Sequence, residues 1–167
     1  MSTYFSIRQK YFTLLEFTRS HTASLRAMDN NPPNDVIYNL EWLCSQALDP
    51  LREAIGSPVI VSSGYRCPDL NTAVGGSPTS YHMLGLAADI YPLDFDRRQQ
   101  IVDILTEAKA KGEAWKLNPK EAEKPLLMFT EAIIYPAFFH IAVAPEGNSQ
   151  KFLLRKYNGF GQGYKRD

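Results

Sequence analysis

The stretch Ser80-Tyr-His-Met-Leu-Gly-Leu-Ala-Ala-Asp89 contains two residues that can bind a metal ion, His82 and Asp89. A second histidine, His140, lies much later in the chain, inside the apolar run 137–143. Two imidazoles and one carboxylate are a sufficient set of protein ligands for a catalytic zinc ion, which keeps its fourth position open for water. Because the chain has only 3 histidines, the use of two of them in one site would indicate a zinc hydrolase or a descendant of one.

The sequence around these residues favours a shared cation. Residues 87–91 are predicted to form a short strand, in which an unpaired carboxylate at Asp89 would be costly unless a cation offsets its charge. His140 has a similar apolar setting, and Gly85 leaves room for the backbone to pass close to a ligand set. Imidazole and carboxylate ligands favour zinc over manganese, iron or cobalt. The ordinary alternatives are that each histidine forms its hydrogen bonds within the core or at the surface, and that Asp89 caps a turn.

Outward from this stretch, helices and strands mix without a regular βαβ alternation. Helices are predicted for residues 7–20, for residues 34–56 with an interruption at Pro50, for residues 68–74, and for about 17 residues that begin at Asp94 or Asp96. Strands are predicted for residues 58–63, 87–91, 126–135 and 138–144, of which the last two are joined antiparallel at Pro136. Residues 152–157 fit an edge strand or a short helix. The predicted fold class is therefore α+β, a small antiparallel sheet with helices packed against it.

The length of 167 residues predicts one domain, residues 1–167, with its core at about 10–145, a surface excursion at 112–125 and an irregular C-terminal tail. The 18 basic and 18 acidic residues give a formal net charge of zero, which argues against nucleic acid as the main partner. No run approaches the roughly 20 apolar residues of a membrane span. The N-terminus has no apolar core of signal-peptide length, so we expect synthesis in the cytosol.

The two cysteines have different settings. Cys44 lies on the apolar face of a predicted helix, which favours a buried free thiol. Cys67 follows a Gly-Tyr-Arg segment near the proposed site and is a further candidate ligand as a thiolate, although no second cysteine lies nearby in the sequence. A disulfide between the two cysteines is compatible with the sequence, which does not require one.

Three segments occur in order along the chain: Ser62-Ser-Gly-Tyr-Arg66, Leu70-Asn-Thr-Ala-Val-Gly-Gly-Ser77 and Ser80-x-His-x-x-Gly-x-Ala-x-Asp89. Together they resemble the zinc D-alanyl-D-alanine carboxypeptidase family, whose relatives include vancomycin-resistance dipeptidases and phage L-alanyl-D-glutamate endopeptidases. Three further segments nearer the N-terminus, residues 16–20, 31–33 and 48–52, resemble one phage and bacterial branch of that family. The similarity covers roughly residues 10 to 145.

The resemblance implies an α+β fold of the Hedgehog/DD-peptidase type and a zinc ion bound by His82, Asp89 and His140. It also implies that Arg66 and Ser80 hold a carboxylate or carbonyl group of the substrate peptide. Independently of the family, arginine offers a planar bidentate fork to a terminal carboxylate. A structural ion pair is the alternative for Arg66, and a purely local loop role is the alternative for Ser80.

The chain departs from the family pattern at the general base. The family places an aspartate or glutamate three residues before the last zinc histidine, and this chain has Ala137 there. Loss of a general base typically costs about two to four orders of magnitude in rate. In the preceding strand, the acidic positions of the family fall on Thr130 and Tyr135. Glu131 in that strand is our candidate for the catalytic role, and Glu146, on the loop after the following strand, is another.

These features predict a zinc-dependent metallopeptidase that acts on peptidoglycan, as a DD- or LD-carboxypeptidase or endopeptidase cleaving next to a D-amino acid. Its partner would be a stem peptide at the bacterial cell wall, reached as a phage lysis protein with holin-dependent delivery or as a virion component. The N-terminus also fits a cytosolic enzyme that acts on precursors. The alternative is a zinc-containing wall-binding or phage structural module that lost catalysis at Ala137. A third reading is an unrelated α+β domain with chance matches.

Overall fold

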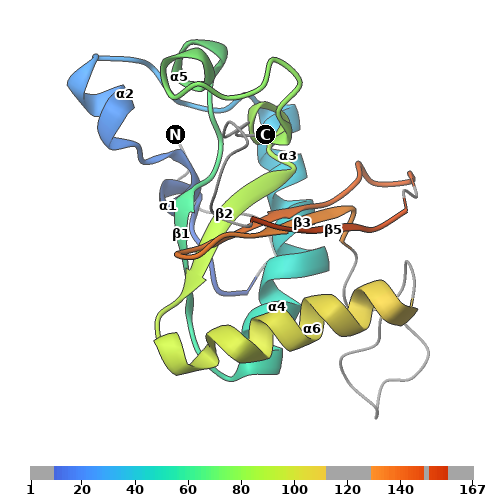
Figure 1. Cartoon of the computed structure of the whole chain (residues 1–167). Coiled ribbons are helices and arrows are strands. Elements are labelled where there is room, and N and C mark those ends of the chain that lie inside the picture. Colours follow the sequence, from blue (N-terminus) through green and yellow to red (C-terminus); the bar gives the residue numbers. More distant parts are fainter. Residues whose placement is uncertain (1–9, 112–128, 149–150, 158–167) are drawn as a thin grey trace.

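Five strands form one mixed sheet in the order β1-β2-β4-β3-β5 (Figure 1). The computed structural model describes residues 10–111, 129–148 and 151–157, which form a single α+β domain, as predicted. The strands are β1 (Val59–Ser63), β2 (Ala87–Pro92), β3 (Glu131–Ile134), β4 (Phe139–Ala142) and β5 (Leu153–Lys156). The first four strands of the sheet pair antiparallel, but β5 runs parallel to β3.

The parallel edge pair corrects the prediction of an antiparallel sheet. β3 and β4 form the antiparallel hairpin expected around Pro136, but the chain after β4 re-enters the sheet on the other side of β3. The chain reverses direction once more, so β5 runs parallel to β3. Of the two alternatives for residues 152–157, the edge strand is therefore the correct one, and the short helix is not. The predicted strand positions 126–128, the excursion at 112–125 and the C-terminal tail fall outside the described residues.

The helices, in chain order, are α1 (Leu14–Thr18), α2 (His21–Leu25), α3 (Asn34–Leu43), α4 (Asp49–Ile55), α5 (Pro68–Ala73) and α6 (Arg98–Lys111), with a π-helical turn η1 (Cys44–Leu48) and the 3-10 turns η2 (Tyr81–Leu84) and η3 (Phe95–Arg97). In Figure 1, α3 and α4 lie behind the sheet, α6 crosses its lower end, and α2 and α5 lie beyond its upper end. The predicted start at Asp94 is confirmed, because its carboxylate accepts a hydrogen bond from Asp96 N at 3.1 Å. Within residues 10–111, 129–148 and 151–157, no helix has the length and hydropathy of a membrane span.

Two helix predictions are wrong in detail. Of the helix predicted for residues 7–20, residues 10–13 are not helical, and among the described residues only α1 forms. The helix α2 was not predicted; it begins after Ser20, whose hydroxyl accepts a hydrogen bond from Ala23 N at 3.2 Å. The helix predicted for residues 34–56 is interrupted before Pro50 and not at it, because Pro50 lies in the first turn of α4, where a missing N–H costs little. The chain widens into η1 just before this proline. Gly56, with φ 59°, ends α4 as predicted.

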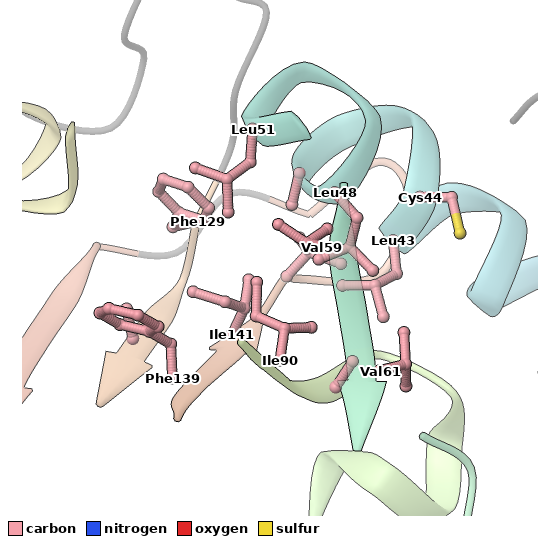
Figure 2. Close-up of a cluster of buried hydrophobic side chains, with 14 of the residues drawn as sticks. Leu43, Cys44, Leu48, Leu51, Val59, Val61, Ile90, Phe129, Phe139 and Ile141 are labelled. Carbon is pink, nitrogen blue, oxygen red and sulfur yellow. The ribbon is translucent and has the colours of Figure 1, made fainter. Parts of the chain in front are cut away.

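The centre of the sheet has one apolar and one polar face. Val61, Ile90 and Ile141 point into the core, where they pack against leucines from α3, η1 and α4 (Figure 2). Successive side chains of a strand point to opposite faces, so the neighbours of these apolar residues lie on the other side. Asp89 and His140 are among them. Packing of the apolar face therefore fixes which polar residues meet on the opposite face.

Candidate metal centre

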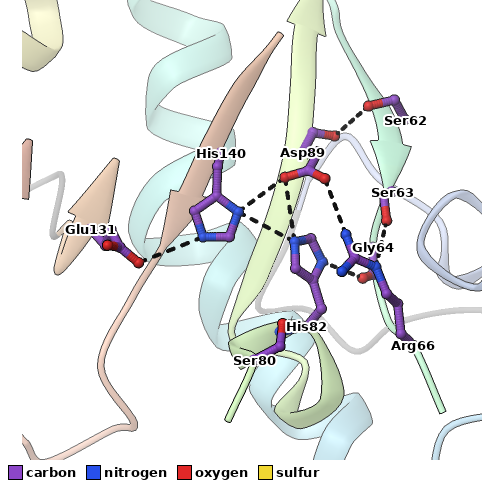
Figure 3. A network of polar contacts seen from close by, with 9 residues as sticks. All are labelled: Ser62, Ser63, Gly64, Arg66, Ser80, His82, Asp89, Glu131 and His140. Carbon is purple, nitrogen blue, oxygen red and sulfur yellow. Dashed lines mark hydrogen bonds and ion pairs between the residues drawn. The ribbon is translucent and has the colours of Figure 1, made fainter. Parts of the chain in front are cut away.

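Asp89 and His140 come from adjacent strands and meet on the polar face of the sheet. They are directly paired in the antiparallel register of β2 and β4, so their side chains project to the same side. His140 Nδ1 lies 3.0 Å from Asp89 Oδ1 (Figure 3). His82, the third predicted ligand, is carried by η2, and its Nε2 lies 3.3 Å from both Asp89 Oδ1 and His140 Nδ1. The structure thus brings the three predicted ligands together.

The short turn η2 holds His82 beside the two strands. The Ser80 hydroxyl accepts a hydrogen bond from His82 N at 3.3 Å, which caps the turn. Gly85 ends η2 in the left-handed conformation, with φ 70°. A Cβ atom at Gly85 would lie 2.7 Å from Val36 O in α3. The space that this glycine leaves is therefore filled by α3 and not by the ligand set, which corrects the interpretation of Gly85 from the sequence.

The backbone of Gly64 orients the His82 ring. His82 is 0% exposed, and its Nδ1 lies 2.7 Å from Gly64 O. A proton on Nδ1 donated to this carbonyl leaves the Nε2 lone pair for a metal. Gly64 is needed here because a Cβ atom would lie 2.5 Å from Phe17 Cα in α1. Gly64 was not among the site residues predicted from the sequence; its one signal was its place inside the Ser-Ser-Gly-Tyr-Arg segment.

A β-bulge in β1 directs residues 62–66 toward Asp89. The register changes between Val61 and Ser63, so that Ser63 faces Asp89. Arg66, which is 5% exposed, donates from Nη2 to Asp89 Oδ2 at 3.2 Å and from Nε to Ser63 Oγ at 3.1 Å. The structural ion pair considered for Arg66 is therefore present. Arg66 also lines the pocket beside Asp89, one of the three candidate metal ligands.

Glu131 lies on the same face of the sheet as the three ligands. Ile133 pairs with His140 across β3 and β4, and Glu131 precedes Ile133 by two residues, so its side chain projects to the His140 side. Glu131 Oε2 is 3.9 Å from His140 Nε2, the ring nitrogen that faces away from Asp89. Arg155 Nη1 of β5 lies 3.5 Å from Glu131 Oε1. The Glu131 carboxylate thus approaches the His140 ring from outside the triad of ligands.

Other candidates from the sequence do not join this group. Ala137 is exposed in the turn between β3 and β4, and Glu146 is exposed on the loop after β4. Among the residues that the structure describes, the cluster able to hold a metal consists of the two histidines and Asp89, without Cys67. Cys44 is a buried free thiol, as predicted, and Cys67 is also free, so the two form no disulfide.

The charges of the site suit a bound cation. Burial alone would raise the pKa of the Asp89 carboxyl, but the adjacent His82 and His140 outweigh it and hold this pKa well below its ordinary value. Burial lowers the pKa of the His82 imidazole, against the opposing influence of Asp89. The favoured states are therefore an ionised carboxylate and a neutral imidazole, which are the states in which these groups bind metals.

The spacing of the donor atoms matches a tetrahedral zinc shell. With bonds of about 2.0–2.1 Å, zinc places neighbouring ligand atoms of a tetrahedron about 3.3 Å apart. The distances among His82 Nε2, Asp89 Oδ1 and His140 Nδ1 are 3.3, 3.3 and 3.0 Å. The donor set of two imidazoles and one carboxylate also agrees with zinc chemistry. These residues therefore fit a zinc ion.

A pocket of about 600 Å³ opens beside the cluster. Asp89 and Arg66 line it on the side of the sheet, and its other walls come from the α1–α2 segment, from α5 and from Phe138. Its volume falls within the roughly 300–1,000 Å³ typical of ligand sites. The pocket gives a small ligand or a peptide end access to the candidate metal centre.

Comparison with known protein families agrees with this geometry. The family model described as Peptidase M15 matches residues 10–117. No curated protein matches the chain. The matched range contains Arg66, His82 and Asp89, whereas His140 lies beyond its end. Peptidases of this family are zinc-dependent, in agreement with the ligand cluster. Because the match covers well over half of the 167 residues, the chain belongs to the Peptidase M15 family.

Proposed function

We propose that this protein is a zinc-dependent peptidase that hydrolyses a peptide bond next to a D-amino acid in peptidoglycan, as a carboxypeptidase or an endopeptidase. The observation that carries the proposal is the triangle of donor atoms at His82, Asp89 and His140, with sides of 3.0 to 3.3 Å. Membership of Peptidase M15 supports the class of reaction. The substrate would be a stem peptide of the bacterial cell wall; delivery with a phage particle or through a holin stays a prediction.

The chain would hold zinc through side chains whose orientation is set by hydrogen bonds to neighbouring residues. Bound zinc would supply a Lewis acid, which polarises a carbonyl group and lowers the pKa of water. The Gly64 carbonyl fixes the His82 ring, and Arg66 fixes the outer oxygen of Asp89. Such outer contacts keep the ligating atoms directed at one point, and their loss typically weakens metal binding by about 10–100-fold.

Arg66 is our candidate for orienting the substrate. Its side chain lines the pocket next to Asp89, and a guanidinium carries five N–H donors in a rigid fork that suits a carboxylate or a carbonyl group. Ser80 has a local role in the structure, because its hydroxyl caps η2. A direct contact between Ser80 and the substrate stays a prediction.

Glu131 is our candidate for the proton acceptor of the reaction. Apart from the candidate ligand Asp89, it is the described carboxylate that approaches His140 on this face of the sheet, at 3.9 Å from Nε2. The usual position of the base is occupied by Ala137, which lies in an exposed turn and has no ionisable group. A carboxylate near a metal site can accept the proton of the attacking water. In this position Glu131 would also keep the His140 ring in orientation.

One observation favours a second function. Ala137 removes the acidic residue of the family position, and a chain without a general base could keep zinc for folding or for recognition of wall peptides. This alternative is a non-catalytic wall-binding or phage structural module. It differs from the peptidase in one measurable property, the release of peptide products.

The test combines metal content with product release. Purified protein is analysed for zinc per chain by atomic emission and is then incubated with purified peptidoglycan, whose soluble products are identified by mass spectrometry. The peptidase should contain about one zinc per chain and release D-alanine or muropeptides, and a folded His140→Ala variant should do neither. Zinc without release, unchanged by Ala137→Glu, would establish the module, and absence of zinc would refute both.

A further inference from the structure

The segment between α1 and α2 is fastened to the end of β1 that adjoins the metal centre. Tyr65 N donates to Phe17 O at 2.8 Å. Asn30, which is 8% exposed, donates through Nδ2 to Thr18 O at 2.9 Å and to Tyr65 O at 3.1 Å. Arg19 follows Thr18 directly, so these bonds fix its backbone relative to the site. The segment is therefore a permanent part of the site and not a loosely attached loop.

This segment forms a wall of the pocket. Arg19 and His21 line the same cavity as Arg66 and Asp89. α2, which begins at His21, lies with α5 beyond the end of β1 (Figure 1). The pocket thus extends from Asp89 to the start of α2.

The wall is rich in hydrogen-bond donors and lacks a matching anion. Of the described residues that line the pocket, Asp89 alone is acidic, and its oxygens already contact Arg66 and both histidines. Within the described part of the chain, no carboxylate forms an ion pair with Arg19 or His21. Two residues that line the pocket, Arg19 and His21, therefore have hydrogen-bond donors that no described carboxylate engages.

We propose that Arg19 and His21 bind a carboxylate on a side chain of the substrate peptide, so that the pocket selects acidic peptides. This inference rests on the proposed function, in which the scissile bond lies at the metal centre and Arg66 orients the reacting end. Arginine binds a carboxylate through two parallel N–H···O bonds, and the imidazole N–H adds a third donor. Arg19 and His21 would then determine specificity without touching the reacting atoms.

The test compares Arg19→Met with Arg26→Met in the full-length, zinc-loaded protein. Arg26 is exposed at the end of α2 and does not line the pocket, so its variant removes the same charge from a neighbouring place. The probes are two synthetic stem pentapeptides that differ only in the D-glutamyl group, a free carboxylate in one and a carboxamide in the other. Hydrolysis gives kcat and KM, and the amide NMR signals of residues 20–24 report binding independently of turnover.

We expect the wild-type protein to prefer the free acid by about tenfold or more in kcat/KM, mainly through KM. Arg19→Met should bring this ratio close to one, whereas Arg26→Met should retain it. Equal hydrolysis of both peptides by the wild type would overturn the inference and leave the proposed function intact. If neither peptide is cleaved, the proposed function fails, and the NMR titration decides: an Arg19-dependent preference for the free acid supports the inference, and its absence refutes it.

Discussion

His140 Nδ1 lies 3.0 Å from Asp89 Oδ1 because the two residues are paired across β2 and β4. The strand register therefore sets two of the three candidate ligands at once. A slip of one residue would turn His140 toward the core and bring Phe139 or Ile141 to the polar face. Both apolar side chains are fully buried, so their packing opposes that slip and keeps the ligand pair in place.

Replacement of Asp89 by asparagine tests the metal centre directly. Asp89→Asn keeps the shape of the side chain but removes the charge that faces both histidines. Zinc affinity should therefore fall by more than the roughly 10–100-fold that is typical when a residue that only orients a metal ligand is replaced. Competition with a chromophoric chelator measures this affinity. Asp96→Asn removes the same charge from an exposed residue of η3 and should bind zinc like the wild type. Equal affinity in the two variants would exclude Asp89 as a ligand.

Glu131→Gln tests the proton acceptor. We expect kcat to fall by about two to four orders of magnitude while the protein still binds about one zinc per chain. Glu146→Gln, at the other acidic position considered for this role, should leave kcat close to that of the wild type. Steady-state hydrolysis and metal analysis on the same samples separate the outcomes. Loss of zinc from Glu131→Gln, in place of loss of rate, would show that its contact with His140 serves orientation alone.

The clustering of the three candidate ligands could be predicted from the sequence because residue type restricts the choice so strongly. The chain offers 3 histidines, and an aspartate inside an apolar strand needs a partner. The direction of Glu131 could not be predicted, because it depends on the pairing of Ile133 with His140 and not on the sequence of β3 alone. Once that pairing is known, alternation along the strand places Glu131 on the face of the site.

The contribution of the backbone to the site could not be predicted either, because it also depends on how the strands pair. The Gly64 carbonyl reaches His82 only because a bulge shifts the register of β1 between Val61 and Ser63. A bulge depends on the fit between two strands, which side-chain patterns within residues 62–66 do not encode. The parallel placement of β5 likewise follows from the path of the chain after β4.

Gly64→Ala tests this backbone contact. The added methyl group would overlap Phe17 Cα at 2.5 Å, so the strand end must move and carry the carbonyl away from His82. We expect a loss of stability of about 1–3 kcal/mol or more together with weaker zinc binding, by about 10–100-fold. Gly56→Ala is the matched control, because it strains a left-handed residue at the end of α4 and should cost about 1 kcal/mol. Unfolding in urea and chelator competition should show that only Gly64→Ala affects both properties.

The buried carboxyl of Asp49 makes the stability of the fold depend on pH. Asp49 is 5% exposed, and its Oδ2 accepts a hydrogen bond from Lys10 N at 2.8 Å, whereas Oδ1 has no hydrogen-bond partner among the described residues. Burial raises its pKa to about 6, against the opposing hydrogen bonds from the Lys10 and Tyr11 backbone. The unfolded chain has the ordinary value of about 3.9. Between these values the folded state binds the proton more tightly, so the contribution of Asp49 to stability is greatest below about pH 4 and is lost as the pH rises through 6.

Asp49→Asn removes this dependence while it keeps an acceptor for Lys10 N. We expect the variant to exceed the wild type in free energy of unfolding by an amount on the order of 1–3 kcal/mol at pH 7.5, with the difference shrinking toward pH 4 because the wild-type carboxyl is then neutral. Urea unfolding of the metal-free protein at both pH values measures the difference. The exposed control Asp96→Asn should follow the wild type at each pH. If Asp49→Asn changes stability by the same amount at both pH values, the charge of the buried carboxylate is not the cause, and the effect comes from packing at the junction of η1 and α4.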